Sequence, residues 1–399
     1  MTPVFICLFF VSALISLFCC LLVKRFGPSV GLIDKPGFRK IHVEPTPTGG
    51  GLGVWLGVLI PLSFLTLLAL GFDQSGPDAA TIFGISISQY PAFISSHIAG
   101  IASRLSQLWT LLGLGTILVI LGTIDDRRGL PWQLRLAVEF LVAIAAVASG
   151  WRATLFIEIP VITWVLSVFW IVGLINSFNM LDNMDALSGG VATICSLFLA
   201  AVAFAFAPNP ISGEPQLFLG GFLILLAGAL IGFLTLNRPP AKMFMGDGGA
   251  YFVGFLLATT TLSITFVGGS APKTAIFVPL CILAVPLYDT ISVVTIRLRN
   301  HVSPFVGDKN HYSHRLVALG LTKPQAVATI YLTTTICAIG SFFLYQVNLT
   351  TAILVFVQTG LILTLVAILE FAARKKINEE EALLKQKENE KTKNENNVR

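Results

Sequence analysis

Charged side chains are scarce in this sequence. Asp, Glu, Lys and Arg make up 12% of its 399 residues, about half the share found in soluble domains. Hydrophobic residues make up 55%, and the mean hydropathy is +0.82. The apolar runs continue for three to five helical turns, whereas the buried strands of a soluble α/β enzyme end after about 4–8 residues. The composition therefore excludes a soluble α/β enzyme and predicts an integral membrane protein without a separate soluble domain.

The sequence also lacks the cysteine patterns that hold disulfides or metals. Its six cysteines all lie inside apolar runs, and none belongs to a CxxC pair. We therefore expect neither a disulfide framework nor a zinc site. The first apolar run has no Ala-x-Ala motif before Lys24 and Arg25, which favours an uncleaved first span over a signal peptide. Nothing in the composition favours a nucleic-acid partner.

Apolar runs of about 17–25 residues, the length that crosses a bilayer as a helix, recur along the chain. We predict eleven spans, near residues 3–23, 52–71, 108–124, 134–149, 161–178, 189–207, 217–236, 249–267, 275–296, 325–345 and 351–371. The predicted fold class is thus an all-α polytopic membrane protein, with one membrane-embedded domain over residues 1–373. Residues 374–399 form a charged tail with few apolar side chains, which we expect to be disordered.

Lysine and arginine residues predict the orientation of these spans, because cytoplasmic loops are enriched in both. With eleven spans, 23 of the 26 basic residues fall on one side together with the tail, and only Arg104, Arg152 and Lys273 fall on the other. The N-terminus is therefore predicted to lie outside, and the C-terminal tail in the cytoplasm, of a bacterial inner membrane.

Polar residues concentrate in five predicted cytoplasmic segments. Ionisable groups at membrane depth are costly to bury, so such clusters indicate function. The first segment, residues 34–51, contains Arg39, Lys40 and His42 in a loop rich in proline and glycine. These side chains suit a phosphate or a diphosphate. The alternative interpretation is a positively charged anchor followed by a helix-entry turn.

The second segment contains adjacent carboxylates, Asp125 and Asp126, at the end of a span. Adjacent carboxylates repel each other unless a cation or a shared proton intervenes. The pair therefore fits either a metal–diphosphate site or a base with a raised pKa. Alternatively, Arg127 and Arg128 neutralise an ordinary helix end at the interface.

The third segment repeats a polar residue at every third position: Asn176, Asn179, Asp182 and Asp185. On a helix these four residues would share one half-face, and the apolar residues between them would face protein or lipid. The regular spacing favours a ligand-binding face over an ordinary polar helix end.

The fourth segment covers residues 237–249, where Pro239 and Pro240 break the helix and Asp247 lies between glycines. A carboxylate on such a turn suits Mg²⁺, which takes one or two carboxylates plus substrate oxygens. Phe244 is placed to stack on a base. A turn in which Asp247 merely caps the next span is equally compatible with these residues.

The fifth segment begins with Asp289 at the end of a span and continues with His311, His314 and Arg315 in a loop. The last three side chains together suit a diphosphate. Zinc binding by the histidines is not expected, because HExxH or HxxxH spacing is missing.

In this order, the five segments resemble one family, the polyprenyl-phosphate N-acetylhexosamine-1-phosphate transferases (MraY/WecA/TagO-like, glycosyltransferase family 4). The resemblance covers residues 34–315 and rests on RKxH…PxPxGG, the DD pair, NxxNxxDNxDxL, NxxPAxxFMGD and HxxHR. It implies ten or eleven transmembrane helices around an active-site cleft that faces the cytoplasm.

The resemblance also implies roles for individual residues. Asp247 would hold Mg²⁺, with Asn179 as a helper and Mn²⁺ as an expected substitute. Phe244 would stack on uracil. The remaining roles are nucleotide binding by Lys40, Asn237 and Asp185, proton abstraction from the lipid phosphate by Asp125 with Asp126 and Asp182 nearby, and contact with the diphosphate and sugar by His311, His314 and Arg315.

The implied reaction transfers a sugar-1-phosphate, expected to be N-acetylhexosamine-1-phosphate, from a UDP-sugar to undecaprenyl or another polyprenyl phosphate and releases UMP. It would be the first membrane step of cell-wall or surface polysaccharide synthesis. The RKxH…PxP loop favours the N-acetylglucosamine-type branch over the muramyl-pentapeptide branch. Two departures stand out: Ala186 replaces a common glycine, and Ser313 replaces a common histidine near the sugar.

A secondary transporter is the alternative from another functional class. It would explain many spans with charged residues, but it predicts charges near mid-membrane and often internal repeats. Here the acidic residues cluster at one predicted face, and the sequence shows no repeat. The sequence leaves the oligomeric state open, a homodimer included.

Overall fold

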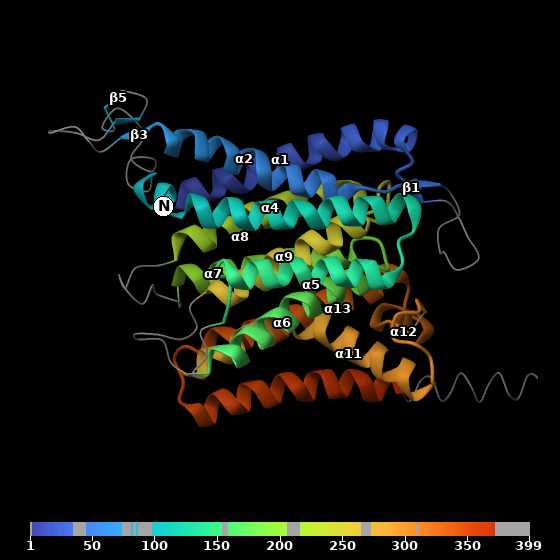
Figure 1. Cartoon of the computed structure of the whole chain (residues 1–399). Helices are drawn as coiled ribbons and strands as arrows, with labels where there is room; N and C mark the ends of the chain where they lie inside the picture. The colour runs from blue at the N-terminus through green and yellow to red at the C-terminus, as the bar shows by residue number, and fades with distance from the viewer. Residues whose placement is uncertain are drawn as a thin grey trace, which may run out of the picture.

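A computed structural model describes residues 2–34, 45–73, 81–82, 85–86, 98–153, 159–205, 216–264, 273–308 and 310–371, so the predicted tail lies outside the described residues. Long helices lie side by side across Figure 1, and a few short helices join them. They are α1 (Thr2–Phe26), α2 (Gly50–Leu70), α4 (Ile98–Arg128), α5 (Trp132–Ala148), α6 (Pro160–Leu181), α7 (Leu187–Ala205), α8 (Leu217–Asn237), α9 (Asp247–Ser263), α10 (Val278–Ile282), α11 (Ala284–Arg299), α12 (Tyr312–Ala318), α13 (Lys323–Phe343) and an unlabelled C-terminal helix, Leu349–Phe371.

Strands in the described residues form two small antiparallel ladders. In the first, β1 (Ile33–Asp34) pairs with β2 (Thr46–Pro47) just before α2. The second contains β3 (Phe72–Asp73), β4 (Thr81–Ile82) and β5 (Ile85–Ser86), and Figure 1 shows it at the opposite end of the helices. Neither ladder forms a core, and the predicted all-α class is confirmed.

The predicted spans coincide with the helices in position. Every one of the eleven predicted segments matches a described helix or the bent pair α10–α11. Eight described helices are long and apolar enough to cross a membrane, and the count reaches nine when the bent pair is taken as one span. Two others, α5 and α9, have 17 residues each, about 26 Å of helix. The multi-pass architecture is confirmed, whereas eleven crossings stay a prediction.

The span predicted near residues 275–296 is broken. The helical segments Thr274–Ile282 and Ala284–Arg299 meet at an angle of 69°. Pro286 has no N–H, so the carbonyl of Ile282 loses its helical partner. Cys195 on α7 donates its S–H to that carbonyl at 3.3 Å. Irregular backbone at membrane depth is tolerated where protein groups satisfy it in this way.

Small residues hold the peripheral helix α1 against the interior of the bundle. Ser12 Oγ lies 2.8 Å from the carbonyl oxygen of Gly57 on α2 and 2.7 Å from that of Leu225 on α8. Ser16 Oγ donates to the carbonyl of Ala229, also on α8, at 2.7 Å. Serine and glycine allow helices in lipid to approach closely and to form hydrogen bonds. The packing of α1, α2 and α8 therefore rests on small and hydroxyl side chains.

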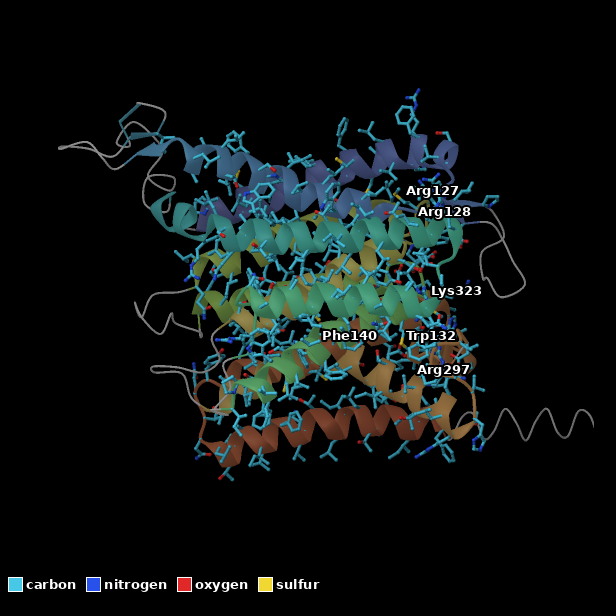
Figure 2. All side chains as sticks on the ribbon, viewed as in Figure 1. Arg127, Arg128, Trp132, Phe140, Arg297 and Lys323 are labelled. Atoms are coloured by element: carbon cyan, nitrogen blue, oxygen red, sulfur yellow. The ribbon has the colours of Figure 1, made fainter. Side chains whose placement is uncertain are left out.

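Basic residues from distant parts of the chain meet at one end of the bundle. Figure 2 shows Arg127, Arg128, Arg297 and Lys323 at this end, although they belong to α4, α11 and α13. β1 and α12 lie at the same end in Figure 1. The predicted cytoplasmic face requires these basic residues to lie at one end of the bundle, as they do.

The backbones of α4 and α9 touch at Gly122. A Cβ at this position would lie 2.1 Å from the backbone nitrogen of Gly248, closer than any real side chain lies. The contact holds the last turn of α4, with Asp125 and Asp126, beside the first turn of α9, which begins at Asp247. The packing of two helices thus brings together acidic residues more than a hundred positions apart.

Gly122→Ala should lower the melting temperature of the detergent-solubilised protein, because the added methyl group forces α4 away from α9. Overpacking of this kind costs about 1–3 kcal/mol. Gly113→Ala on the same helix is the matched control, since a Cβ there meets no atom within 4 Å. It should leave the melting temperature unchanged or slightly higher. Equal melting temperatures for the two variants would contradict the close approach.

Candidate active site

Three carboxylates and one guanidinium meet where α4, α5 and α9 come together. Asp125 accepts hydrogen bonds from Arg135 Nη1 and from the backbone N–H of Leu130, each at 2.6 Å. Arg135 Nη1 also lies 3.7 Å from Asp247 Oδ2. Asp126 Oδ1 accepts the backbone N–H of Asp247 at 3.2 Å. The structure therefore brings the predicted DD pair and Asp247 into one cluster.

The turn before α9 allows this contact because it contains Gly246. This residue caps the helix with a φ of +76°, a left-handed conformation that favours glycine. A Cβ here would also lie 2.4 Å from Asp126 Oδ2. Asp247 is thus the first residue of α9 rather than its cap, and the capping interpretation of Asp247 is wrong.

The predicted helical half-face in the third polar segment is also wrong. Asn176 and Asn179 lie on α6, but the helix ends at Leu181. Asp182 has a ψ of 53° and begins a turn that also contains Asp185. The four polar residues therefore do not share one helix: the two asparagines lie at the end of α6, and the two aspartates lie in the turn that follows it.

Asp182 joins the carboxylate cluster from this turn. Burial, together with the negative charges of Asp126 and Asp185, raises the pKa of Asp182 to about 7. Burial is the larger cause, and the repulsion from the two neighbouring charges that adds to it is what a cation would relieve. Asn179, half-buried in the last turn of α6, precedes Asp182 by one turn.

The loops before α7 and α9 are bonded to each other. The side-chain oxygen of Asn237 accepts the backbone N–H of Ala186 at 2.8 Å, and its amide group donates to the carbonyl of Met243 at 2.8 Å. Asp185 Oδ2 accepts the backbone N–H of Ala241 at 2.9 Å. Asn237 is buried, and the contacts described for its side chain are with backbone groups of the protein. Its predicted contact with a nucleotide stays a prediction.

Ala186, one of the two departures from the family pattern, has a φ of +63°. A residue with a side chain pays about 1–2 kcal/mol in this left-handed region. Its N–H is bound by Asn237, and its carbonyl accepts a hydrogen bond from the hydroxyl of Tyr331. The left-handed backbone explains why glycine is common at this position. The two hydrogen bonds explain how the protein accommodates alanine there.

Phe244, the predicted uracil-stacking residue, lies where two loops meet. Its N–H donates to the carbonyl of Pro47 at 2.9 Å, and its carbonyl accepts the N–H of Gly50 at 2.9 Å. Its side chain is half-buried. These bonds join the loop before α9 to the segment before α2. The three predicted cationic or donor residues of that segment lie outside the described residues: Arg39, Lys40 and His42.

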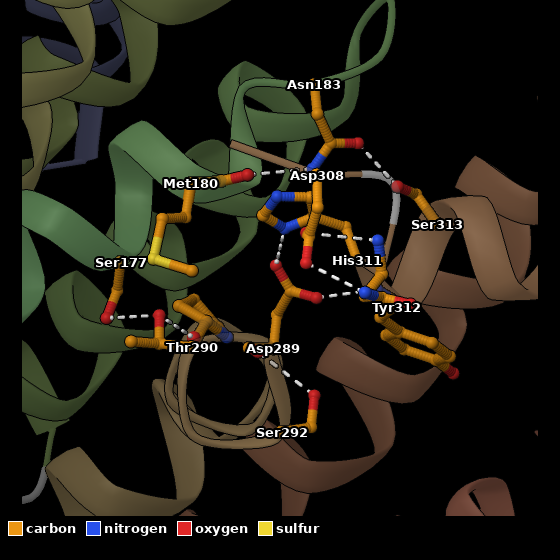
Figure 3. Close-up of polar contacts among 12 residues, drawn as sticks. Ser177, Met180, Asn183, Asp289, Thr290, Ser292, Asp308, His311, Tyr312 and Ser313 are labelled. Carbon is orange, nitrogen blue, oxygen red and sulfur yellow. Dashed lines mark hydrogen bonds and ion pairs between the residues drawn. The ribbon is translucent and has the colours of Figure 1, made fainter. Parts of the chain in front are cut away.

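The histidines of the fifth segment are placed by α11 and by the turn after α6 (Figure 3). His311 Nδ1 lies 2.9 Å from Asp289 Oδ2. The ring centroids of His311 and His314 are 6.2 Å apart. Ser313, the second departure from the family pattern, donates its hydroxyl hydrogen to Asn183 in the turn that contains Asp182. The fifth segment therefore contacts the third.

Arg315 turns towards the C-terminal helix. Its Nε donates to Glu370 Oε2 at 2.8 Å, its Nη2 to Ser292 Oγ at 2.9 Å, and its Nη1 to the carbonyl of Asn310. The hydroxyl of Tyr288 also donates to Glu370 Oε2, at 2.9 Å. These contacts favour a structural role for Arg315, and its predicted contact with a diphosphate stays a prediction.

The loop between α11 and α12 is stabilised by a second ion pair. Arg297 Nη2 lies 3.0 Å from Asp308 Oδ1, and the side chain of Asn310 donates to Asp308 Oδ2 at 2.7 Å. Partial burial disfavours the ionised carboxyl, but the hydrogen bonds from Arg297 and Asn310 outweigh it and lower the pKa of Asp308 to about 2. Asp308 therefore stays ionised at any physiological pH and anchors this loop to Arg297 on α11.

A divalent cation fits the chemistry of the carboxylate cluster. Asp126, Asp182 and Asp247 offer oxygen ligands, and their mutual repulsion favours a cation among them. Within the described part of the chain, no group of three or more His, Cys, Asp or Glu side chains surrounds a common metal position. Mg²⁺ does not require one, because it binds one or two carboxylates and takes its other ligands from water and substrate phosphates.

Membrane-length helices with a carboxylate cluster at one end of them define a polytopic membrane protein with a site suited to a charged ligand. A sequence profile described as glycosyl transferase family 4 matches residues 108–265. The chain is 31% identical over 333 residues to a probable undecaprenyl-phosphate N-acetylglucosaminyl 1-phosphate transferase of Bacillus subtilis, covering 81% of this chain and 80% of that protein. It belongs to glycosyltransferase family 4, among the polyprenyl-phosphate N-acetylhexosamine-1-phosphate transferases.

Two further relatives are similar over comparable lengths. A decaprenyl-phosphate N-acetylglucosaminephosphotransferase of Mycolicibacterium smegmatis is 29% identical, covering 83% of this chain and 79% of that protein. An undecaprenyl-phosphate alpha-N-acetylglucosaminyl 1-phosphate transferase of Escherichia coli is 27% identical, covering 79% and 77% respectively. The resemblance based on the five motifs is therefore confirmed.

Three residues of this end of the bundle were not assigned roles from the sequence. Arg135 lies near the start of the predicted span 134–149, where it pairs with Asp125 and lies beside Asp247. Asn183 binds Ser313, and Glu370 binds Arg315. An arginine and a glutamate inside predicted spans are themselves functional signals, so Arg135 and Glu370 could have been noticed. Their partners could not, because the sequence does not show which helices touch.

Glu370→Leu should lower the melting temperature strongly, because it leaves the buried Arg315 guanidinium without a counter-charge. Breaking a buried pair costs roughly 3–5 kcal/mol, whereas replacing both partners with apolar residues is often neutral. The double variant Arg315→Leu/Glu370→Leu should therefore regain most of the melting temperature and also most of the activity. A stable but inactive double variant would show instead that Arg315 contacts the substrate.

Proposed function

We propose that this chain transfers N-acetylglucosamine-1-phosphate from UDP-N-acetylglucosamine to a polyprenyl phosphate. The observation that supports this most directly is the carboxylate cluster around Arg135 at the basic end of the bundle. Catalysis of phosphoryl transfer rests on positioning and on electrostatic stabilisation, and such a cluster would provide both once it holds a cation. The names of the relatives, which specify N-acetylglucosamine phosphate and polyprenyl phosphates, supply the substrates.

In the proposed reaction, an oxygen of the lipid phosphate attacks the β-phosphorus of the UDP-sugar. The bond between this phosphorus and the bridging oxygen breaks, and its electron pair leaves with UMP. A phosphate monoester has a second pKa of about 6, so the lipid phosphate is mostly a dianion at pH 7 and needs little proton abstraction. Asp125 already accepts two hydrogen bonds. We therefore assign Asp125 to orienting Arg135 rather than to removing a proton.

Mg²⁺ is the proposed cofactor, with Mn²⁺ as its substitute. Asp247 would hold the ion, and Asp126, Asp182 and Asn179 are the nearby oxygen donors. When bound, the ion neutralises charge on the diphosphate and the leaving UMP. Arg135, 3.7 Å from Asp247, adds a second positive charge from the protein itself.

The nucleotide site is proposed at the junction of the loops before α2 and α9. Phe244, half-buried there, would stack on uracil, a contact worth about 1–3 kcal/mol. Asp185 and Asn237 hold the surrounding loops together, and Lys40 would add a cation. His311 and His314 are the proposed contacts to the diphosphate and the sugar.

The site is proposed to face the cytoplasm of a bacterial inner membrane, where UDP-sugars are available. The carboxylate cluster lies at the basic end of the bundle, and the positive-inside rule predicts that this end faces the cytoplasm. The transporter alternative predicts charged groups near mid-membrane, whereas the cluster lies in the last turn of α4 and the first turn of α9. We therefore do not favour it.

Reporter fusions after Arg128, Lys242 and Lys323 should all report a cytoplasmic location, because these residues belong to the basic end. Fusions near Gly76 and Lys273 should report an external location. The measurement is the ratio of a cytoplasm-active to a periplasm-active reporter in intact cells. An external location for the Lys242 fusion would divide the proposed site between the two faces of the membrane and refute it.

The proposed function is tested by incubating detergent-purified protein with polyprenyl phosphate, Mg²⁺ and a panel of UDP-sugars. UMP and lipid-linked sugar should appear in equal amounts, with UDP-N-acetylglucosamine the best donor. Release of UMP without lipid-linked product would indicate hydrolysis, and absence of both with every donor would refute the proposal.

Asp247→Asn should reduce the transfer rate at least about a thousandfold, which corresponds to roughly 4 kcal/mol, because the substitution removes the negative charge that would hold Mg²⁺ most strongly. The melting temperature should change little, since the backbone N–H that Asp126 binds remains. Asp73→Asn, in β3 at the opposite end, is the control and should keep full activity. Substantial activity of Asp247→Asn at ordinary Mg²⁺ concentrations would place the metal on Asp126 or Asp182.

A further inference from the structure

Asp289 on α11 is a fully buried carboxylate that has no role in the reaction proposed above. Its exposed fraction is 0%. Burying a charge in the interior is costly unless hydrogen bonds compensate. Asp289 Oδ2 lies 2.9 Å from His311 Nδ1, and Asp289 Oδ1 accepts the backbone N–H of Tyr312 at 2.5 Å (Figure 3). Both described partners belong to the fifth polar segment.

The contact determines which nitrogen of His311 has the hydrogen. An ionised carboxylate only accepts hydrogen bonds, so His311 Nδ1 must be the donor. The second ring nitrogen, Nε2, is then the one left for another partner. The ring itself has little freedom, because His311 is 6% exposed. The tautomer and the orientation of the imidazole are therefore fixed from α11.

The surroundings of Asp289 are fixed relative to the site. The hydroxyl of Thr290, the next residue on α11, donates to Ser177 Oγ on α6 at 2.8 Å. On the other side, the hydroxyl of Ser313 donates to Asn183, beside Asp182. Figure 3 shows His311 between these two links. The imidazole is thus held by residues that are themselves bonded to α6 and to the turn that follows it.

We propose that Asp289 is a positioning residue for the transfer reaction: it holds His311 as the Nδ1–H tautomer so that the unprotonated Nε2 accepts a hydrogen bond from a hydroxyl group of the donor's sugar. The inference rests on the proposed function, which assigns the histidines of this segment to the diphosphate and the sugar. A carboxylate that orients a histidine through Nδ1 is a general way to direct the other nitrogen at a substrate.

A purely structural role for Asp289 would act through Tyr312, because the bonded N–H belongs to the first residue of α12. Asp289→Asn separates the two roles. The asparagine oxygen can still accept the Tyr312 N–H, but its amide group must now donate towards His311 Nδ1. The imidazole would then be forced into the opposite tautomer, with the hydrogen on Nε2, while the end of α12 stays bonded.

The experiment is a double-mutant cycle between Asp289→Asn and His311→Gln, read as kcat/KM for UDP-N-acetylglucosamine. With His311 present, Asp289→Asn should lower kcat/KM about a hundredfold, the scale of a misplaced catalytic-site group. With Gln at position 311, the same change should cost less than about threefold. The KM for polyprenyl phosphate should not change. Ile291→Ala, at an exposed position of the same helix, is the control and should keep kcat/KM within about threefold of the wild type.

A hundredfold loss from Asp289→Asn in both backgrounds would overturn the proposal in favour of a structural role, as would an unchanged kcat/KM with His311 present. The tautomer gives a readout that needs no turnover. In protein labelled with ¹⁵N-histidine, the signal that disappears in His311→Gln should show a protonated Nδ1 in the wild type and a protonated Nε2 in Asp289→Asn. A wild-type signal with protonated Nε2 alone would overturn the proposal even if no UDP-sugar were turned over, whereas lack of turnover with the expected signal would refute only the assigned reaction.

Discussion

Repulsion between carboxylates is the constraint on which the architecture of this end of the bundle depends. Asp125 and Asp126 come from α4, Asp247 from α9, and Asp182 from the turn after α6. Left to electrostatics, these groups would move apart. They are held together because α4 and α9 meet backbone to backbone, and because Arg135 lies between two of the carboxylates. The packing of the bundle thus concentrates negative charge at a position where a cation can balance it.

The loops around this cluster are held by backbone hydrogen bonds rather than by apolar packing. Asn237 and Asp185 use their side chains to bind backbone groups of neighbouring loops, and Phe244 is bonded through its backbone to two further residues. Side chains that hold a loop in this way restrict its motion at modest cost, since each bond replaces one to water. A substrate that binds there meets loops whose positions are already set.

Hydropathy predicted the helices well, because the length and apolar character of a span are local properties of the chain. Every predicted segment coincides with a helix, and the DD pair and Asp247 do meet. The half-face expected for Asn176 to Asp185 was wrong because the helix ends at Leu181, and the turn that follows is bonded through Ala186 to residues of other helices. The pairing of Arg315 with Glu370 was equally hidden, since it joins residues 55 positions apart. Non-local contacts of this kind are what a single sequence cannot reveal.

The position of Glu370 also has a consequence for biogenesis. It lies in the last described helix, and its partner Arg315 belongs to the segment that contains His311 and His314. During synthesis, the carboxylate cluster is complete in sequence long before this helix leaves the ribosome. The histidine segment, by contrast, cannot gain its final anchor until almost the whole chain has been made and inserted. The nascent enzyme therefore assembles its acidic half first and its histidine half last, so a chain truncated before Glu370 would contain every proposed ligand yet lack the contact that secures one side of the site.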